Sequence, residues 1–467
     1  MRKGWMPVLT AVVTMVAVAG CSAGPTGTAS SSGGAAGGDK VLTIWTVEDV
    51  AERVTAQQKI LDAYTAKTGT KTKLVAVAED QLATVLASAA AANDLPDAIG
   101  AVSMNGINQL QTDKLLDTAA AAKVVNDLGA GTFSPRALEL LKDGDTQLAV
   151  PSDGWAQLLF YRKDLFDAAG LAAPTSYDAI MKAAQTLDKG KLAGIVASTA
   201  PADSFTQQTF EHFALANNCQ LVTGDALSLN SPACEESLKF YADLIKGYSA
   251  SGNQDADTTR ATYFAGDAAM VVWSSFLLDE LAGLRNDALP TCDKCKADPK
   301  WLAKNTGIVS AIQGPSSTEP ASFGEIVSWA ILDGADADTA GLVEYMMSDG
   351  YADWLAVAPE GKVPTRFGTA DEPAKYTDAW KQLKTGVDTK ELLSDTYSPE
   401  ILAAVAAAPN GFNRWGLPQG KGALAAAVAN QFVIPKILNE MWDSGLSGKD
   451  AAAKAQEQAQ SISDELG

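Results

Sequence analysis

The sequence predicts an α/β fold with a parallel sheet, in a chain long enough for two or three domains. From Lys40 onward 428 residues follow a low-complexity N-terminal stretch. In the first part of this body, apolar strand-like runs alternate with stretches whose apolar residues recur at helical spacing, separated by short turns. Such alternation is typical of parallel sheets with right-handed crossovers, whose ligand crevice lies beyond the carboxyl ends of the strands.

The first elements follow one another without long connections. In order, we expect a strand at 41–46, a helix that stops at Gly69, a strand at 71–77, an Ala-rich helix through Ala89, a turn at 93–97 and a strand at 98–102. The helix assignments depend on apolar residues three and four positions apart, and the glycine supplies a helix stop signal.

In the middle of the chain, the turn residues between the apolar runs follow a different pattern. Residues 151–154, Pro-Ser-Asp-Gly, separate two apolar runs with no helix between them, which predicts a break where the chain leaves one sheet for another. Further strand-like runs are expected at 268–273, 306–312 and 323–332. The last hundred residues predict helices, interrupted at residues 409–411 and at Pro418.

Five segments in collinear order resemble the extracellular solute-binding proteins of ABC importers, in their carbohydrate-binding branch. They are DLPDAIG (94–100), PSDGWAQLLFYRKDLFDAAGL (151–171), YFAGDAAMVVW (263–273), GEIVSWAILDG (324–334) and GKVPTR (361–366). The resemblance covers nearly all of the body and implies the two-lobed periplasmic-binding-protein type II fold, with a hinge between the lobes. It also implies a function: capture of a sugar or oligosaccharide and its delivery to an ABC permease in the membrane.

By the same resemblance, each lobe is built from two parts of the chain. Lobe 1 is expected to hold residues 40–152 and 314–365, and lobe 2 residues 153–313 and 366–467. A protein whose two lobes open and close needs a ligand that prefers the closed form, because a ligand with equal affinity for both forms would not shift the equilibrium between them. The protein is expected to act as a monomer without a cofactor.

A site for a sugar needs aromatic rings that pack against the C–H faces of the sugar and polar groups that hydrogen-bond its hydroxyls. Strand ends, crossings and Gly/Pro-flanked loops supply ten candidates for ligand binding: Trp45, Glu48, Asp49, Asn105, Asp153, Trp155, Trp273, Glu325, Arg366 and Trp415. Each has a plainer alternative. The tryptophans could pack in a core, Glu48 or Asp49 could cap the following helix, and the other polar residues could simply be solvated.

Residues 1–20 have the pattern of an export signal. Arg2 and Lys3 precede an apolar run at 8–19, which is shorter than the roughly 18 residues that a membrane span needs. Val18-Ala19-Gly20-Cys21 resembles a lipoprotein cleavage site, which implies a lipid on Cys21; the alternative is an ordinary signal with an incidental cysteine. Residues 21–39, rich in Gly, Ser and Ala, predict a flexible linker, so the body is expected at the outer face of the membrane.

Four further cysteines predict two disulfides in an exported protein, Cys219 with Cys234 and Cys292 with Cys295. The second pair forms a CxxC, which could also hold zinc or do redox chemistry. Zinc would need two more ligands, and the chain offers only His212 and no second CxxC, so we expect no metal. A net charge of −20 opposes binding to nucleic acid and to anionic lipid headgroups.

The sequence argues against most enzyme classes. A single histidine excludes histidine-rich metal sites, and there is neither a nucleophile elbow nor a Walker phosphate loop. Carboxylates are plentiful, so two alternatives stay open beside the sugar receptor: a surface glycan hydrolase, and the same fold binding a non-sugar solute. The leading prediction is a binding protein with no enzymatic activity.

Overall fold

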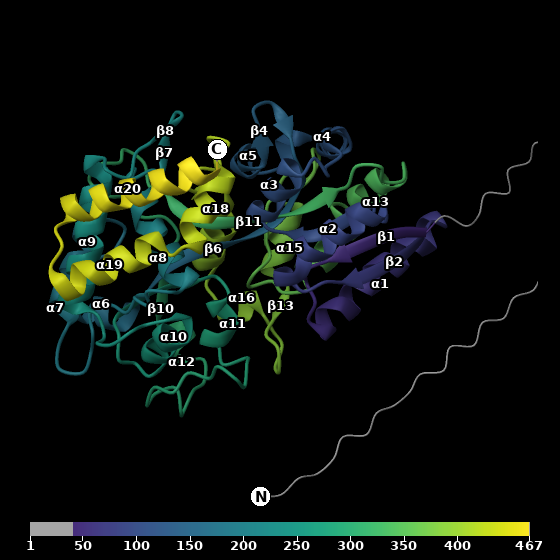
Figure 1. Cartoon of the computed structure of the whole chain (residues 1–467). Coiled ribbons are helices and arrows are strands. Elements are labelled where there is room, and N and C mark those ends of the chain that lie inside the picture. The colour runs from purple at the N-terminus through teal and green to yellow at the C-terminus, as the bar shows by residue number, and fades with distance from the viewer. Residues whose placement is uncertain (1–40, 467) are drawn as a thin grey trace, which may run out of the picture. The chain divides into compact units, whose positions relative to one another are not determined.

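A computed structural model describes residues 41–466 and places a mixed sheet of nine strands at the centre of the fold (Figure 1). The strands are β1 (Val41–Thr46), β2 (Lys71–Ala76), β3 (Ala98–Val102), β4 (Lys142–Asp143), β5 (Thr146–Gln147), β6 (Val150–Arg162), β7 (Val222–Thr223), β8 (Ala226–Leu227), β9 (Met270–Ser274), β10 (Thr306–Val309), β11 (Ser322–Ile331), β12 (Val363–Pro364), β13 (Lys384–Thr385), β14 (Glu391–Leu392) and β15 (Phe412–Asn413). The sheet runs in the order β10-β6-β11-β3-β1-β2, with β9 and β12 also paired to β6 and β15 to β11.

The helices are α1 (Ala51–Thr68), α2 (Leu82–Ala92), α3 (Met104–Thr112), α4 (Thr118–Asp127), α5 (Pro135–Leu140), α6 (Lys163–Ala169), α7 (Tyr177–Leu187), α8 (Ser204–Ala216), α9 (Pro232–Tyr248), α10 (Ala256–Phe264), α11 (Leu277–Leu281), α12 (Trp301–Lys304), α13 (Thr339–Met346), α14 (Tyr351–Leu355), α15 (Lys375–Lys381), α16 (Leu393–Thr396), α17 (Pro399–Ala407), α18 (Gly422–Asn430), α19 (Val433–Ser444) and α20 (Gly448–Leu466). Short 3-10 helices are η1 (Glu79–Gln81), η2 (Ala130–Thr132) and η3 (Ala408–Asn410). The predicted export signal, Cys21 and linker lie outside the described residues.

The first three strands confirm the predicted parallel arrangement. β1 pairs in parallel with β2 on one side and with β3 on the other. α1 ends where expected, because Gly69 adopts a left-handed conformation with φ 83° and its N–H caps the carbonyl of Thr65. The carboxyl ends of β1, β2 and β3 therefore meet at one edge of the sheet.

The predicted break at residues 151–154 is wrong, because β6 runs through it without interruption from Val150 to Arg162. Two features let the strand continue. Pro151, which has no N–H to donate, lies where the register between β6 and β11 shifts. Gly154 lets two strands approach closely, since a Cβ there would lie 2.6 Å from the carbonyl oxygen of Glu325.

β6 changes partners along its length. Its first half pairs with β11 and β12, and its second half with β9 and β10, always antiparallel. β11 is also antiparallel to β3, so the sheet is mixed rather than wholly parallel. The chain therefore passes from one set of strands to another within a strand and not at a turn.

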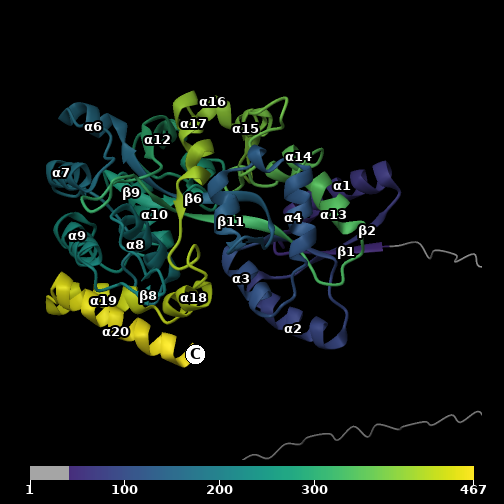
Figure 2. The ribbon, with the colours of Figure 1, turned by 90° about the horizontal axis from the view of Figure 1, so that it is seen from above.

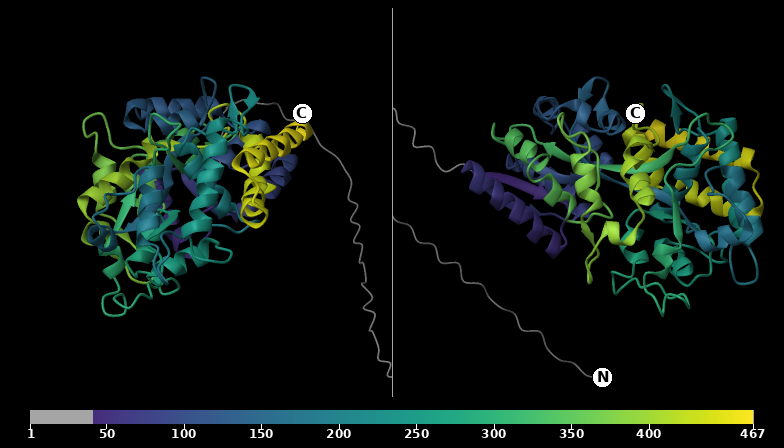
Figure 3. Two further views of the ribbon diagram at one scale, coloured as in Figure 1. Left: turned by 90° about the vertical axis from the view of Figure 1, so that its left-hand side faces the viewer. Right: turned by 180° about the vertical axis from the view of Figure 1, so that it is seen from behind.

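The buried apolar side chains form two separate clusters. The first contains the side chains around β1, β3 and α14, and the second those around α8, α9 and α20. The first also includes side chains of α11, α15 and α17. Figure 1 shows α9, α19 and α20 at one end and β1, β2 and α1 at the other, and the right-hand view of Figure 3 shows the purple and the yellow segments at opposite ends from behind. In Figure 2, β6 and β11 lie between the two groups.

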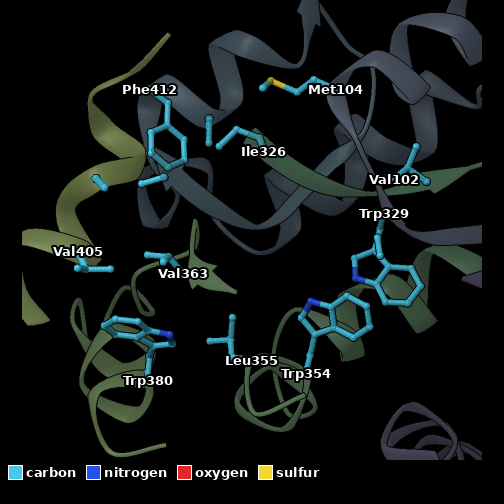
Figure 4. Close-up of a cluster of buried hydrophobic side chains, with 14 of the residues drawn as sticks. Val102, Met104, Ile326, Trp329, Trp354, Leu355, Val363, Trp380, Val405 and Phe412 are labelled. Carbon is cyan, nitrogen blue, oxygen red and sulfur yellow. The ribbon is translucent and has the colours of Figure 1, made fainter. Parts of the chain in front are cut away.

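The first cluster is rich in tryptophan (Figure 4). Trp329 and Trp354 pack with ring centroids 5.1 Å apart, and Trp380 is fully buried nearby. Gly100 makes room for this packing, since a Cβ there would lie 2.7 Å from the ring of Trp329. Trp354 lies in α14 and Trp380 in α15, and both are buried. Over residues 41–466, the helices are all too short or too polar to span a bilayer.

Candidate functional site

A cavity of about 450 Å³ opens at the carboxyl ends of the first three strands, where β6 and β11 cross between the lobes. We call it the cleft. Its acidic lining residues are Glu48 and Asp49 after β1, Glu79 after β2, Asp153 in β6 and Glu325 in β11. Arg53, Lys362 and Arg414 bring three positive charges. Carboxylates outnumber cations in the lining, which disfavours anionic solutes.

Six of the ten predicted site residues line the cleft: Glu48, Asp49, Asn105, Asp153, Trp155 and Glu325. The alternative that Glu48 or Asp49 caps a helix is wrong. Val50 occupies the N-cap position of α1, and no side chain caps that helix end. The structure thus brings together residues that lie up to 277 positions apart in the sequence.

Trp45 and Trp415 are not among the lining residues of the cleft. Trp45 is 8% exposed and packs within the first apolar cluster. Trp415 is 2% exposed, belongs to the second cluster and donates its indole N–H to the carbonyl of Cys219 at 2.8 Å. Both side chains therefore have the packed environment that was the alternative to ligand contact.

Trp273 and Arg366 also lie outside the cleft lining. Trp273 is half-buried and donates its indole N–H to the carbonyl of Ala256 at 2.9 Å. Arg366 is 4% exposed, and its guanidinium donates to the carbonyls of Leu128 and Met347. It also donates to the hydroxyls of Thr132 and Tyr376, so the arginine ties separate segments of the chain together.

A buried ion-pair network forms one wall of the cleft. The ammonium of Lys362 lies 2.6 Å from Glu48 Oε1 and 3.4 Å from Asp153 Oδ1. Arg53 contacts the other oxygen of Glu48 at 2.7 Å. Asp153 Oδ2 accepts a hydrogen bond from the indole N–H of Trp354 at 2.7 Å. Each buried charge therefore has a partner, as the cost of removing ions from water requires.

The network sets the ionisation of its members. Burial opposes the charge on Glu48, but Lys362 and Arg53 outweigh it and lower the pKa of Glu48 to about 2. Burial would lower the pKa of Lys362, yet the charges of Asp153 and Glu48 keep it above its ordinary value. Burial raises the pKa of Asp153, because a single lysine shared with Glu48 only partly offsets the desolvation. We therefore regard Lys362 and Glu48 as the fixed ion pair.

The opposite wall carries a second buried pair. Arg414 forms a salt bridge with Glu325 and lies 3.8 Å from Glu211. The other Glu325 oxygen accepts the backbone N–H of Met104 at 2.6 Å, which joins β11 to the start of α3. Glu211 accepts the backbone N–H of Trp415 at 2.7 Å. Burial raises the pKa of Glu211, and the charge of Arg414 counters this.

Four polar side chains of the lining make no hydrogen bond or ion pair with any part of the chain that the structure describes: Asp49, Glu79, Asn105 and Gln208. Burial, followed by the charges of Glu325, Glu48 and Asp49, raises the pKa of Glu79. Two carboxylates and two amides are thus free to bond a solute.

Aromatic rings flank these free groups. Trp155 and Phe276 both line the cleft and are half-buried, so each keeps part of its surface available. Trp155 is held from behind by Phe323, with ring centroids 5.8 Å apart. Arg414 lies over the other ring of this pair, 4.5 Å from the centroid of Phe323. Apolar ring faces beside free polar groups suit a solute that has both C–H faces and hydroxyls.

The backbone is unusual where β3 enters the cleft. Ala101 lines the cavity with a φ of 63°, a left-handed conformation that is uncommon for alanine. Ala101 lies where the pairing register between β3 and β11 shifts. The kink precedes Ser103, which caps α3 by accepting the N–H of Gly106, and so helps to place Asn105 at the cleft.

Sequence reasoning missed several lining residues, notably Arg53, Glu79, Gln208, Phe276, Lys362 and Arg414. Glu79 could have been found by the rule that gave Glu48, because it follows the end of the neighbouring strand. Lys362 lies in the motif GKVPTR, beside the predicted Arg366. Gln208 and Phe276 carry no comparable sequence signal.

Other functional groups are accounted for by packing. His212 is fully buried, burial lowers its pKa to about 3, and its Nδ1 accepts the N–H of Phe323 at 3.2 Å. The sulfur atoms of Cys219 and Cys234, and those of Cys292 and Cys295, lie at bonding distance, with Cα atoms 4.6 and 4.9 Å apart. Within residues 41–466, no group of three metal-ligating side chains could hold an ion.

Comparison with known sequences points to one class of protein. The profile of a family described as bacterial extracellular solute-binding protein matches residues 49–282. The chain is also similar to the ABC transporter periplasmic-binding protein YcjN of Escherichia coli strain K12, with 26% identity over 373 residues, covering 78% of this chain and 80% of YcjN.

Solved structures with a similar fold include three sugar-binding proteins. The cyclic alpha-maltosyl-1,6-maltose binding protein of Arthrobacter globiformis has a TM-score of 0.68 at 18% identity, over 91% of this chain and 99% of its own. An extracellular solute-binding protein of Staphylococcus aureus, solved with maltose, has a TM-score of 0.68 at 17% identity, over 91% of this chain and 98% of its own. The GacH receptor of Streptomyces glaucescens, solved with acarbose, has a TM-score of 0.64 at 16% identity, over 91% of this chain and 98% of its own. The two-lobed fold is therefore confirmed.

Proposed function

Because the chain belongs to the bacterial extracellular solute-binding protein family, we propose that it captures a sugar or oligosaccharide and delivers it to an ABC import permease. The observation that carries the sugar assignment is the cleft lining. Free carboxylates and amides, at Asp49, Glu79, Asn105 and Gln208, stand beside the half-buried rings of Trp155 and Phe276. Hydroxyls would bond the polar groups, and sugar C–H faces would cover the rings.

Members of this family are receptors rather than enzymes, which confirms the prediction of a non-enzymatic protein. The acidic groups of the cleft also have roles that need no chemistry. Glu48 and Asp153 share Lys362, and Glu325 holds Arg414. These pairs fix the walls, whereas the unpaired groups contact the ligand.

The lobes close on the solute by bending at the strands that connect them. β6 pairs with one set of strands in its first half and with another in its second, and the predicted boundary at residue 152 falls inside it. The boundary at 313 precedes β11 and that at 365 follows β12, so all three crossings form the hinge. Ligand contacts with both walls, Asp49 on one lobe and Gln208 on the other, would favour the closed form.

A panel of sugars tests the function directly. We expect saturable quenching or enhancement of tryptophan fluorescence and a raised Tm with at least one mono- or oligosaccharide, and no product by chromatography. Maltose, maltotetraose, ribitol and tagatose are suitable first members, since these are ligands of solved neighbours. Turnover of a glycan, or no response to any sugar, would overturn the proposal.

A matched pair of tryptophan variants locates the binding. Trp155→Ala should weaken the affinity for the responding sugar by roughly tenfold or more, because an aromatic anchor of the cleft is lost. Trp301→Ala is the control, since Trp301 is also half-buried but lies outside the cleft lining, between Arg162 and Lys294. Equal losses in both variants would argue against the cleft as the site.

The N-terminal proposals have their own tests. We propose that Cys21 carries the lipid that holds the protein at the outer face of the membrane, and that the protein acts as a monomer without nucleic-acid partners. Cys21→Ala should move the protein from the membrane fraction to the medium without changing its affinity for sugar. Continued sedimentation with membranes would contradict the lipid anchor.

Both cysteine pairs are proposed to be disulfides in the exported protein. Alkylation followed by mass spectrometry should label none of Cys219, Cys234, Cys292 and Cys295 before reduction and all four after it. Labelling of the unreduced protein at any of them would contradict that pair.

A further inference from the structure

A second cavity, of about 720 Å³, adjoins the cleft between α2, α3 and α18. We call it the side groove. Val47, Glu79, Ser103 and Asn105 line both cavities. The side groove therefore opens into the cleft, and one ligand could occupy both spaces.

The wall of the side groove has a chemistry different from that of the cleft. Its floor consists of aliphatic side chains that belong to the first apolar cluster, including Leu86 of α2 and Leu110 of α3. Its charged lining residues are Glu79, at the junction with the cleft, and Asp113. No aromatic ring stands among the lining residues of the described chain. Flat aromatic plates suit sugar rings, whereas an aliphatic trough suits an alkyl chain.

Small residues keep the side groove open. Ala83, Ala87 and Ala90 of α2 line it, and the first two are exposed. Ala426 of α18 lines the facing side. A larger apolar residue at any of these places would fill the space that the alanines leave, so the width of the groove depends on their size.

By the lobe bounds that the family resemblance implies, the side groove spans both lobes, because α2 and α3 lie within 40–152 and α18 lies within 366–467. α2 and α3 supply leucines to the first apolar cluster, whereas Leu424 and Val428 of α18 belong to the second. α18 approaches α3 closely, since a Cβ at Gly422 would lie 2.8 Å from the side chain of Asn108. A group held in the groove would touch both lobes and favour the same closed form as the solute in the cleft.

We propose that the side groove binds an aliphatic substituent of the ligand, an alkyl or acyl chain attached to the sugar whose polar part lies in the cleft. The inference rests on the proposed sugar-binding function. The side groove shares four lining residues with the cleft. An alkyl or acyl chain attached to a sugar in the cleft can therefore enter the side groove directly, which favours this occupant. Burial of each methylene in an aliphatic wall strengthens binding.

Alkyl glycosides of one sugar provide the test. We would measure the affinity of the purified protein for maltose and for n-hexyl β-maltoside, below its critical micelle concentration, by calorimetry. The hexyl chain should tighten binding by roughly tenfold or more. Ala87→Phe, which fills the groove, should remove this gain and leave the affinity for maltose unchanged.

Ala92→Phe is the matched control, because Ala92 is exposed on the same helix and does not line the groove. It should keep the full gain from the hexyl chain. A gain that survives Ala87→Phe, or that both variants lose equally, would overturn the proposal. So would maltose binding with no gain from the chain, which would leave the sugar function intact.

Two further outcomes separate the groove from the function. Binding of hexyl maltoside but not maltose, abolished by Ala87→Phe alone, would support the groove while arguing against sugar capture in the cleft. Failure of both compounds to bind would overturn the groove proposal, and the sugar panel would then decide the function. Concentration-dependent dimerisation that Ala87→Phe abolishes, without any gain from the chain, would assign the groove to a second copy of the protein.

Discussion

Two groups of buried carboxylates show how differently this protein treats the same residue type. In the cleft wall, Glu48 and Asp153 share Lys362 at ion-pair distance. In α11, Asp279 is fully buried, yet within residues 41–466 it has no ion pair. The first group has a cation placed between its members, whereas the second faces further carboxylates.

The surroundings of Asp279 explain its ionisation. Burial, followed by the negative charges of Glu360 and Glu280, raises the pKa of Asp279 to about 8. The nearby cations are already engaged, because Arg260 and Arg285 both pair with Glu280. The comparison teaches that depth alone does not set ionisation: Lys362 and Arg53 together keep Glu48 charged, whereas the lack of a paired cation leaves Asp279 protonated at neutral pH.

Removal of the shared lysine should break the comparison most strongly. Lys362→Met leaves Asp153 buried without a cation and Glu48 with Arg53 alone, and it should lower the free energy of unfolding by about 3 to 5 kcal/mol, measured by urea denaturation. Lys304→Met is the control, because Lys304 is 57% exposed and, among the residues that the structure describes, pairs only with Asp298. Its effect should stay within about 0.5 kcal/mol, and equal losses would show that the buried network adds nothing.

Acid should weaken the first group through Glu48. Its pKa is lowered from 4.5 to about 2, so its contribution is complete above pH 4.5 and is lost as the pH falls toward 2. The loss should reach about 3 kcal/mol. Unfolding free energies of the wild type and Glu48→Gln should therefore differ near neutral pH and converge near pH 2. A difference that does not change with pH would contradict the lowered pKa.

The second group should respond in the opposite direction. The pKa of Asp279 is raised from 3.8 to about 8, so the folded state binds the extra proton and loses stability as the pH rises through this range. Asp279→Asn, which imitates the protonated form, should be nearly equal in stability to the wild type at pH 4 and should become progressively more stable than the wild type as the pH rises toward 8. Thermal unfolding at both pH values checks this. Asp293→Asn, at a surface aspartate 97% exposed, should show no such pH-dependent gain.

The smallest effect on stability is expected at Glu79, which separates binding from folding. Its side chain makes no hydrogen bond or ion pair within the described residues, so Glu79→Gln should change the free energy of unfolding by no more than about 0.5 kcal/mol. The same variant should weaken sugar binding several-fold, because a free acceptor of the cleft is lost. Glu372→Gln, at an exposed glutamate outside the cleft, should change neither quantity. Unchanged affinity in Glu79→Gln would remove this residue from the site.

The fold was predictable where local signals agreed with one another. The alternation of strands and helices over residues 41–102 is confirmed almost to the residue, because periodicity, turn residues and the glycine stop all act over short distances. The break at 151–154 was wrong for the same reason. Proline and glycine usually end a strand, but here the register shift and the close approach of Glu325, 171 positions on from Gly154, let it continue.

The candidate site was predictable at strand ends and not elsewhere. Glu48, Asp49 and Asn105 follow strands whose carboxyl ends meet, so topology alone brings them together. Trp45 also lies at a strand end, but it occupies a strand buried on both faces, where sequence position does not indicate which side chains reach a cavity. The lowered pKa of Glu48 depends largely on Lys362, whose distance from Glu48 no local pattern encodes.

The sequence by itself determined the class of protein: its α/β alternation, its acidic surface, its collinear family motifs and the polar residues that follow the first strands. Only the tertiary structure decided which carboxylates are paired and which are free for a ligand. It also decided that Arg366 ties loops together and that an aliphatic groove opens beside the cleft. The reason is physical, because secondary structure follows from neighbours along the chain, whereas ionisation, burial and cavities follow from groups that only folding brings within a few ångströms.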